Sequence, residues 1–337
     1  MMRMAIALSM ATFLPPTASG IECAQCHPKQ AAAHAKTLMA QTLEPAATAR
    51  LLRANPKLEF TLDRFRYLIE NGTYTVSDGT RSLSLPIRWG MGQGDAGQTY
   101  ILEHDGKFIE SRVSFYNDIR KLGLTIGAPP GTPATLEQAV GREMSKADVI
   151  GCFGCHTAPG PKSASVAKGT LEWTATLKPG VQCENCHADA TRHAANPAAR
   201  PASLKNSTAE EMSDLCGVCH RTWADIAANG PRGLANVRFQ PYRLAKSKCY
   251  NAADARISCT ACHDSHERPA GVATPSTDRA CAACHNSTAQ THARSCGAAK
   301  TSDCASCHMP KFSLPGAHYQ FTDHRIRIVR NKNEYPD

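Results

Sequence analysis

The chain has 337 residues, of which 42% are hydrophobic and 20% charged, and its 38 Lys and Arg against 29 Asp and Glu give a formal charge of +9. Taken alone, this charge suggests an anionic partner such as nucleic acid or lipid headgroups. Beyond residue 20 no apolar stretch approaches the length of a membrane-spanning helix, which excludes a helical integral membrane protein.

Residues 1–20 have the pattern of a secretory signal peptide. Arg3 precedes an apolar run from Ala5 to Leu14, and the small residues Ala18 and Gly20 stand before a cut at Ile21. The run is too short to cross a bilayer, and the alternative is an ordinary buried helix. We therefore expect a periplasmic or extracellular protein with no transmembrane segment.

Seven times along the chain, two cysteines three positions apart are followed directly by histidine. The cysteine pairs are Cys23 and Cys26, Cys152 and Cys155, Cys183 and Cys186, Cys216 and Cys219, Cys259 and Cys262, Cys281 and Cys284, and Cys304 and Cys307. The histidines that follow them are His27, His156, His187, His220, His263, His285 and His308. The first motif stands alone, and the other six fall within residues 152–308.

This spacing suits the covalent attachment of haem c. Cysteines at positions i and i+3 of a helical turn project to one side, where each can form a thioether with a haem vinyl group, and the next residue can bind the iron. A zinc site or a thioredoxin-like redox pair also uses CxxC, but neither requires the histidine. The sequence therefore predicts seven covalently bound haem c groups, each with iron.

The long gap after the first motif has a different pattern. From Leu58 to Tyr116 apolar and polar residues alternate, and hairpin signals occur at Asn71-Gly72, Asp78-Gly79 and Asp105-Gly106. This pattern predicts a small antiparallel sheet with strands at residues 65–70, 73–77, 82–87, 99–103 and 107–115.

The chain thus divides into segments with different patterns. We expect a signal peptide over 1–20, an N-terminal single-haem segment over 21–57, an inserted β-sheet region over 58–126, a Pro/Gly-rich linker over 127–140 and a six-haem cytochrome core over 141–337. With as few as 22 positions from the first cysteine of one motif to that of the next in the core, the porphyrins themselves must supply much of the packing. The predicted fold class is mostly α and irregular, haem-packed, with a small inserted antiparallel sheet.

Each haem iron has a sixth coordination position opposite the motif histidine. The residue that fills it distinguishes an electron carrier from a catalyst, because an open position permits a substrate to bind. Seven histidines lie outside the motifs, enough to provide a second axial ligand for every iron. Six are predicted second ligands, namely His34, His193, His266, His292, His318 and His324. His104 flanks the Asp105-Gly106 turn and is favoured as a turn residue, so one iron would lack a second histidine.

Two cysteines, Cys249 and Cys296, are not used by the motifs. In an oxidising compartment they form the one available intramolecular disulfide, and buried free thiols are the alternative.

Haem also changes the meaning of the charge. Without Arg3 the chain carries 37 basic and 29 acidic residues, and fourteen propionates bring the holoprotein to about +1 oxidised and about −6 reduced. The partners expected are therefore redox proteins rather than nucleic acid, with donor, acceptor and oligomeric state left open.

Several of these segments resemble known multihaem proteins. GVQCENCHADATRH resembles the GVxCExCHGPxxxH element of the multihaem cytochrome c family that includes the tetrahaem carrier of ammonia oxidisers, and ISCTACHDSH and CASCHMPK are similar to doubled-CXXCH cytochromes. The resemblance covers roughly residues 21–44 and 150–328. It implies closely stacked haems with His34 and His193 as second ligands, and a more distant relation to hydroxylamine oxidoreductase and the pentahaem nitrite reductases.

The sequence thus favours an electron-transfer protein. Two alternatives stay open at this point: an oxidoreductase that acts on a small nitrogen or sulfur species at one open haem, and a structural subunit of a haem filament.

Overall fold

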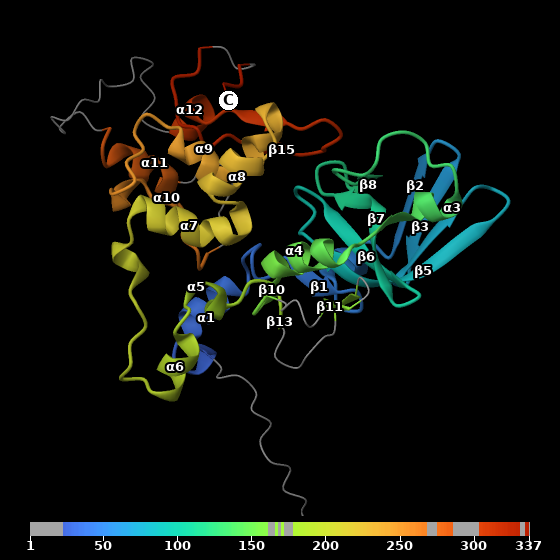
Figure 1. Cartoon of the computed structure of the whole chain (residues 1–337), viewed down its shortest axis with the longest axis horizontal. Helices are drawn as coiled ribbons and strands as arrows, with labels where there is room; N and C mark the ends of the chain where they lie inside the picture. Colours follow the sequence, from blue (N-terminus) through green and yellow to red (C-terminus); the bar gives the residue numbers. More distant parts are fainter. Residues whose placement is uncertain are drawn as a thin grey trace, which may run out of the picture.

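The computed structural model describes residues 23–160, 166–167, 170–171, 178–267, 275–285, 303–330 and 334–336. The expected signal peptide, His292 and Cys296 lie outside the described residues. Within the described part, a large curled sheet occupies one side of the molecule and a group of short helices the other (Figure 1).

A nine-stranded antiparallel sheet forms most of the N-terminal half. Its strands follow the order β2-β3-β4-β5-β6-β7-β8, with β1 paired to β5 and β9 paired to β7. Their bounds are β1 Leu43–Pro45, β2 Lys57–Leu62, β3 Phe65–Glu70, β4 Thr73–Ser77, β5 Ser82–Met91, β6 Gln98–His104, β7 Lys107–Tyr116, β8 Lys121–Leu124 and β9 Gly141–Glu143. The end strands β2 and β8 contact each other, so the sheet curls into a nearly closed barrel.

The predicted fold class, mostly α with a small sheet, is therefore wrong. All five predicted strands are present, as β3 to β7, but four further strands join them. Two of these, β1 and β9, pair with strands far away in the sequence, at Leu43↔Met91 and Ile109↔Glu143. Each is only three residues long, too short to show an alternating pattern of its own.

The sheet also crosses the expected segment boundaries. Strand β1 comes from the expected N-terminal single-haem segment and β9 from the first residues of the expected six-haem core. The boundaries themselves remain predictions.

Tight turns explain why neighbouring strands pair in register. At Asn71-Gly72 and at Asp105-Gly106 both residues have positive φ, between 49° and 72°. Two left-handed residues make the type I′ turn, whose twist matches that of the flanking strands. Residues 70 and 73 and residues 104 and 107 are accordingly direct partners across their hairpins.

The interior of the sheet is a single apolar cluster. Phe65, Tyr67 and Ile69 alternate with more exposed residues along β3, and their buried rings and branches meet Tyr74 and Val76 of β4. Helix α3, Leu136–Val140, contributes three more buried side chains to the cluster. Alternation of period two is what places these residues on one face.

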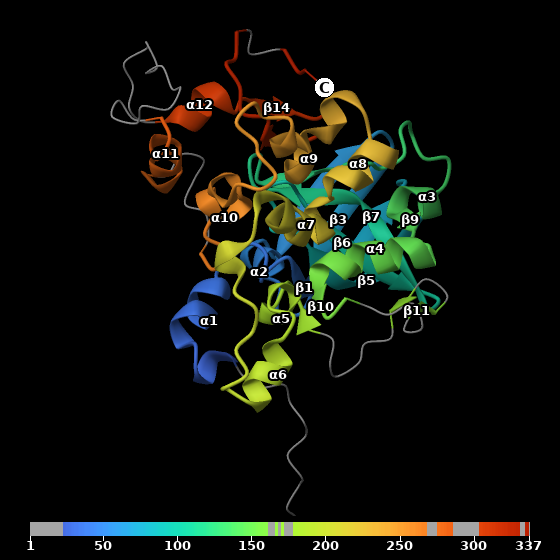
Figure 2. The same ribbon diagram turned by 60° about the vertical axis from the view of Figure 1, so that its left-hand side comes forward.

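A second apolar cluster joins the sheet to the first helix of the helical half. Helix α4, Lys146–His156, buries Val149 and Phe153 against the sheet, and the rings of Phe153 and Phe108 stack with centroids 5.6 Å apart. Both ribbon views place α4 beside β6 (Figure 1, Figure 2). The second cysteine motif forms the last turns of α4, so the sheet fixes its position.

The rest of the described chain consists of short helices and small two-stranded sheets. The helices are η1 Cys23–Gln25, α1 Pro28–His34, α2 Arg50–Ala54, α5 Cys183–Cys186, α6 Ala190–Ala195, η3 Leu204–Asn206, α7 Ala209–His220, α8 Trp223–Asn229, η4 Gly233–Arg238, α9 Gln240–Ala245, η5 Ala255–Ile257, α10 Cys259–Cys262, α11 Pro275–Ala282 and α12 Cys304–His308. The paired strands are β10 Thr157–Ala158 with β13 Lys178–Pro179, β11 Val166–Ala167 with β12 Thr170–Leu171, and β14 Lys311–Ser313 with β15 Gln320–Thr322. Among the residues described, none of the helices combines the length and the apolar character needed to cross a membrane.

The turn at Gly106 offers a test of the sheet. Gly106 has φ +70° and open space around its Cα, so a side chain there meets backbone strain and no clash. We expect Gly106→Val to lower the free energy of unfolding by about 1–2 kcal/mol, whereas Gly106→Asn, which tolerates this conformation, costs much less. Urea denaturation followed by far-ultraviolet circular dichroism measures both, and equal losses would contradict the assigned turn.

Candidate haem attachment sites

All seven motifs lie at helical turns. In the first, third, fifth and sixth motifs the histidine N–H donates to the carbonyl of the first cysteine, over 2.8–2.9 Å. The second, fourth and seventh motifs lie within or end the helices α4, α7 and α12. Each motif therefore presents its two cysteines on one side of a turn, as attachment to two vinyl groups of one haem requires.

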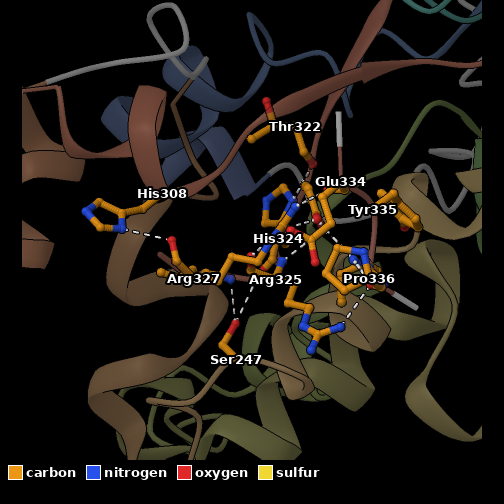
Figure 3. A network of polar contacts seen from close by, with 12 residues as sticks. Ser247, His308, Thr322, His324, Arg325, Arg327, Glu334, Tyr335 and Pro336 are labelled. Carbon is orange, nitrogen blue, oxygen red and sulfur yellow. Dashed lines mark hydrogen bonds and ion pairs between the residues drawn. The ribbon is translucent and has the colours of Figure 1, made fainter. Parts of the chain in front are cut away.

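Several motif histidines have their ring oriented by a hydrogen bond at Nδ1. Nδ1 of His156 donates to the carbonyl of Thr42 over 2.9 Å, and Nδ1 of His308 donates to the carbonyl of Arg327 over 2.9 Å (Figure 3). Nδ1 of His220 is 3.1 Å from Oε1 of Gln240. A proton held at Nδ1 leaves the Nε2 lone pair available for a metal.

Burial favours the neutral form of several imidazoles at the sites. It lowers the pKa of His156, His220 and His263 below the usual range for histidine. It also lowers the pKa of His324 to about 4. A neutral ring is the form that binds iron.

Three motif histidines face a second histidine from elsewhere in the chain. The pairs are His27 with His193, His187 with His266, and His263 with His324, and in each pair the ring centroids are 6.2 Å apart. No other two histidine rings are paired in the described part of the chain.

This separation tests whether the residues fit an iron. Imidazole nitrogens bind metals at about 2 Å, and the ring centre lies about 1 Å behind the nitrogen, so two rings on opposite sides of one iron have centres about 6 Å apart. Two rings in direct van der Waals stacking would be closer. The three pairs therefore fit axial ligation from both sides of a haem.

The structure distributes the predicted second ligands unevenly. His193, His266 and His324 join pairs, although His193 faces the first motif rather than the third motif just before it. Nε2 of His34 is 2.9 Å from the carbonyl of Val181, two residues before the third motif. His292 lies outside the described residues.

His318 and His104 lie against the sheet. The His318 ring meets Tyr116 edge-on, with centroids 4.9 Å apart, and lies against Gly123. His104 is half exposed at its turn and lies 3.5 Å from the carboxylate of Asp105. Their predicted roles, as second ligand and as turn residue, remain predictions.

Several attachment sites lie beside one another. The Cys259 thiol of the fifth motif raises the pKa of Cys216 in the fourth, and the Cys155 thiol of the second motif raises the pKa of Cys219 in the fourth. Helix α7, which carries the fourth motif, contacts α10 with the fifth and α4 with the second.

The same holds at both ends of the series. Burial and the neighbouring Cys23 thiol of the first motif raise the pKa of Cys183 in the third. Asp278 of α11 accepts hydrogen bonds from the backbone N–H groups of Asp303 and Cys304, which joins the sixth motif to the seventh. The motifs form a connected series rather than isolated sites.

Cys249 is exposed, and its predicted partner Cys296 lies outside the described residues. Their disulfide remains a prediction.

Sequence reasoning missed the residues that hold the ligands in place. The carbonyl of Thr42 and the side chain of Gln240 orient motif histidines, and Asp323 next to His324 is completely buried. Of these residues, only Asp323 could have been noticed in the sequence, because its carboxylate directly precedes His324, an expected second ligand.

The ligand pairs predict the effect of removing one ring. In the loaded protein, His266→Ala should convert one iron from low-spin to high-spin, because His187 would be left alone on it. His104→Gln is the matched control, since His104 is half exposed at a turn. Electron paramagnetic resonance of the oxidised protein measures both, and an unchanged spectrum for His266→Ala would contradict this pair.

Comparison with known proteins agrees with this geometry. Residues 175–274 match the family model of cytochrome c3, and residues 132–188 match that of cytochrome c554 and c-prime. No curated protein and no solved structure matches the chain. The two family matches support a multihaem c-type cytochrome, with covalently bound haem c and its iron.

Proposed function

We propose that the chain is a seven-haem c-type cytochrome that transfers electrons between redox proteins outside the cytoplasm, with mostly bis-histidine irons. The observation that carries this proposal is the set of three imidazole pairs at 6.2 Å, each with one ring from an attachment motif. An iron with a histidine on both sides has no position for a substrate and is suited to electron transfer. Haem c would supply an iron that cycles between the ferric and ferrous states.

The order of contacts supports conduction along the chain. The first motif contacts the third, and the cysteines of the third influence those of the fourth. The fourth contacts the fifth and the second, and helices α10, α11 and α12 continue the series through the fifth, sixth and seventh motifs. We infer a path from the first site through the third, fourth, fifth and sixth to the seventh, with the second site as a branch at the fourth.

The compartment follows from sequence and chemistry together. The pattern of residues 1–20 is that of an exported chain, and the family matches point to c-type cytochromes, which are typically periplasmic or extracellular. The specific relation to the tetrahaem carrier is part of this proposal, supported by the match of residues 132–188 to the cytochrome c554 and c-prime model.

Haem stoichiometry and redox titration test the proposal. We expect seven haems per chain, by pyridine haemochrome assay against protein concentration, and mostly negative midpoint potentials, because bis-histidine ligation gives lower potentials than His/Met ligation. Fewer than seven haems, or midpoints that are all well positive, would contradict it.

A second candidate function has an observation of its own. In the described part of the chain, the rings of His156, His220, His285 and His308 face no second histidine ring. An iron left open at one of these sites could reduce or oxidise a small nitrogen or sulfur species.

Electron paramagnetic resonance separates the two functions. A high-spin ferric signal that shifts when nitrite or hydroxylamine is added would support the oxidoreductase. A spectrum that is wholly low-spin and indifferent to both would exclude it and leave electron transfer.

A further inference from the structure

One short segment near the C-terminus reaches two haem sites at once. It comprises residues 322–327 and begins at the last residue of β15. The ring of His324 faces His263 of the fifth motif, and the carbonyl of Arg327 accepts the Nδ1 hydrogen of His308 in the seventh motif. Figure 3 shows His324 and Arg327 on this segment and His308 joined to Arg327 by a hydrogen bond. Any shift of the segment would therefore change the ligands of both sites.

A buried ion pair fixes the segment to α9. Nε of Arg243 donates to Oδ1 of Asp323 over 2.8 Å, and Nη2 donates to Oδ2 over 3.0 Å, so the pair is bidentate. Both side chains are 0% exposed. Asp323 also contacts the guanidinium of Arg327 and accepts from the backbone N–H of Arg325 over 3.0 Å. All hydrogen-bonding directions of the carboxylate are thus used on the segment and its support.

The support itself is rigidly held. Nη1 of Arg243 donates to the side-chain carbonyl of Asn236 over 3.3 Å, Nη2 donates to the carbonyl of Pro336 over 3.0 Å, and the guanidinium lies 4.2 Å from the ring centre of Tyr335. A planar fork with this many partners has one geometry available, which a lysine could not reproduce.

A second clamp lies on the other side of His324. The hydroxyl of Ser247 donates to the carbonyl of His324 over 3.2 Å and accepts from the backbone N–H of Ile326 over 2.8 Å. Nδ1 of His324 donates to the carbonyl of Thr322 over 3.0 Å, which leaves Nε2 on the side of the ring that can bind a metal. The backbone on both sides of this histidine is therefore immobilised from α9 and the residues after it.

We propose that the Arg243–Asp323 ion pair is a positioning device that sets the second ligand of the fifth haem and the hydrogen-bond acceptor of the seventh haem's histidine together. This inference rests on the proposed haem ligation. Neither residue touches a haem in this role; both act through His324 and Arg327. A buried ion pair is costly to desolvate and is weak evidence for stability alone, so its place beside two ligand sites favours a specific geometric task.

The test uses the fully loaded protein with Asp323→Asn and Arg243→Met. Each should remove one low-spin ferric signal, that of the fifth site, because His324 is no longer held opposite His263. Each should also shift the midpoint potential of the seventh site to more positive values, because His308 loses an acceptor that makes its imidazole more electron-donating. A merely structural pair would not move these two sites together while leaving the signals of the first and third sites unchanged.

Three further variants make every outcome informative. Asp254→Asn is the matched control, because it removes one carboxylate from the exposed Arg256 pair just before the fifth motif, and it should leave the spectra as in the parent. Arg243→Lys keeps the charge without the bidentate geometry and should give intermediate shifts. It replaces Asp323→Asn and Arg243→Met in the test if those two variants do not take up haem. His324→Ala removes the ligand itself.

The outcomes separate the inference from the proposed function. If His324→Ala removes the low-spin signal while Asp323→Asn, or Arg243→Lys in its place, matches the parent, the positioning role is overturned and the haem ligation stands. If His324→Ala leaves all signals unchanged, the ligation of the fifth site fails and the inference with it.

Discussion

A haem iron held by two histidines makes a demand that no local stretch of sequence can meet. The first ligand comes with the attachment motif, but the second must arrive from the opposite face of the porphyrin, at the 6.2 Å ring separation found in the three pairs. A histidine a few residues beyond its own motif is on the wrong side of the ring. His193 illustrates this, since it follows the third motif closely in sequence yet faces His27 of the first. On the proposed ligation, the chain of the C-terminal half must return to these sites to bring a second histidine opposite the first.

The sheet makes such returns possible by supplying the apolar core that the short helices lack. Residues 178–267 have few fully buried large side chains, whereas the sheet buries whole rows of aromatic and branched residues. Phe153 of α4 extends this core to the second motif, and the carbonyl of Thr42, just before β1, orients the histidine of the same motif. One haem site is therefore built partly on the sheet, and the others continue from it through contacts between motif helices.

Strands that carry their own sequence pattern could be predicted, whereas strands that depend on a distant partner could not. The strands β3 to β7 could be predicted because each carries its own alternation and ends at a turn with residues that tolerate positive φ. The strands β1 and β9 could not, because three residues become a strand only through a partner elsewhere in the chain. The error in fold class arose from these additions and from treating the gap after the first motif as a small insertion.

The candidate sites follow the same division. The fourteen cysteines and seven motif histidines could be read directly, because attachment chemistry fixes their spacing. The expected second ligands were singled out by residue type, and their role remains a prediction. Which motif histidine each of them faces could not be predicted, because it depends on which segments meet in space. The pairing of Asp323 with Arg243 could not be predicted for the same reason, because the two residues are far apart in the chain and are joined only by the fold.

The contact between Gly123 and His318 has a consequence for how this protein can vary. Gly123 is an ordinary strand residue with unstrained backbone, yet a Cβ there would lie 2.8 Å from Nε2 of His318, on the hairpin of β14 and β15. That hairpin leads directly into the segment that carries His324. A side chain at position 123 therefore requires the His318 ring to move, and this contact links changes in the sheet, through the hairpin, to the segment that carries His324.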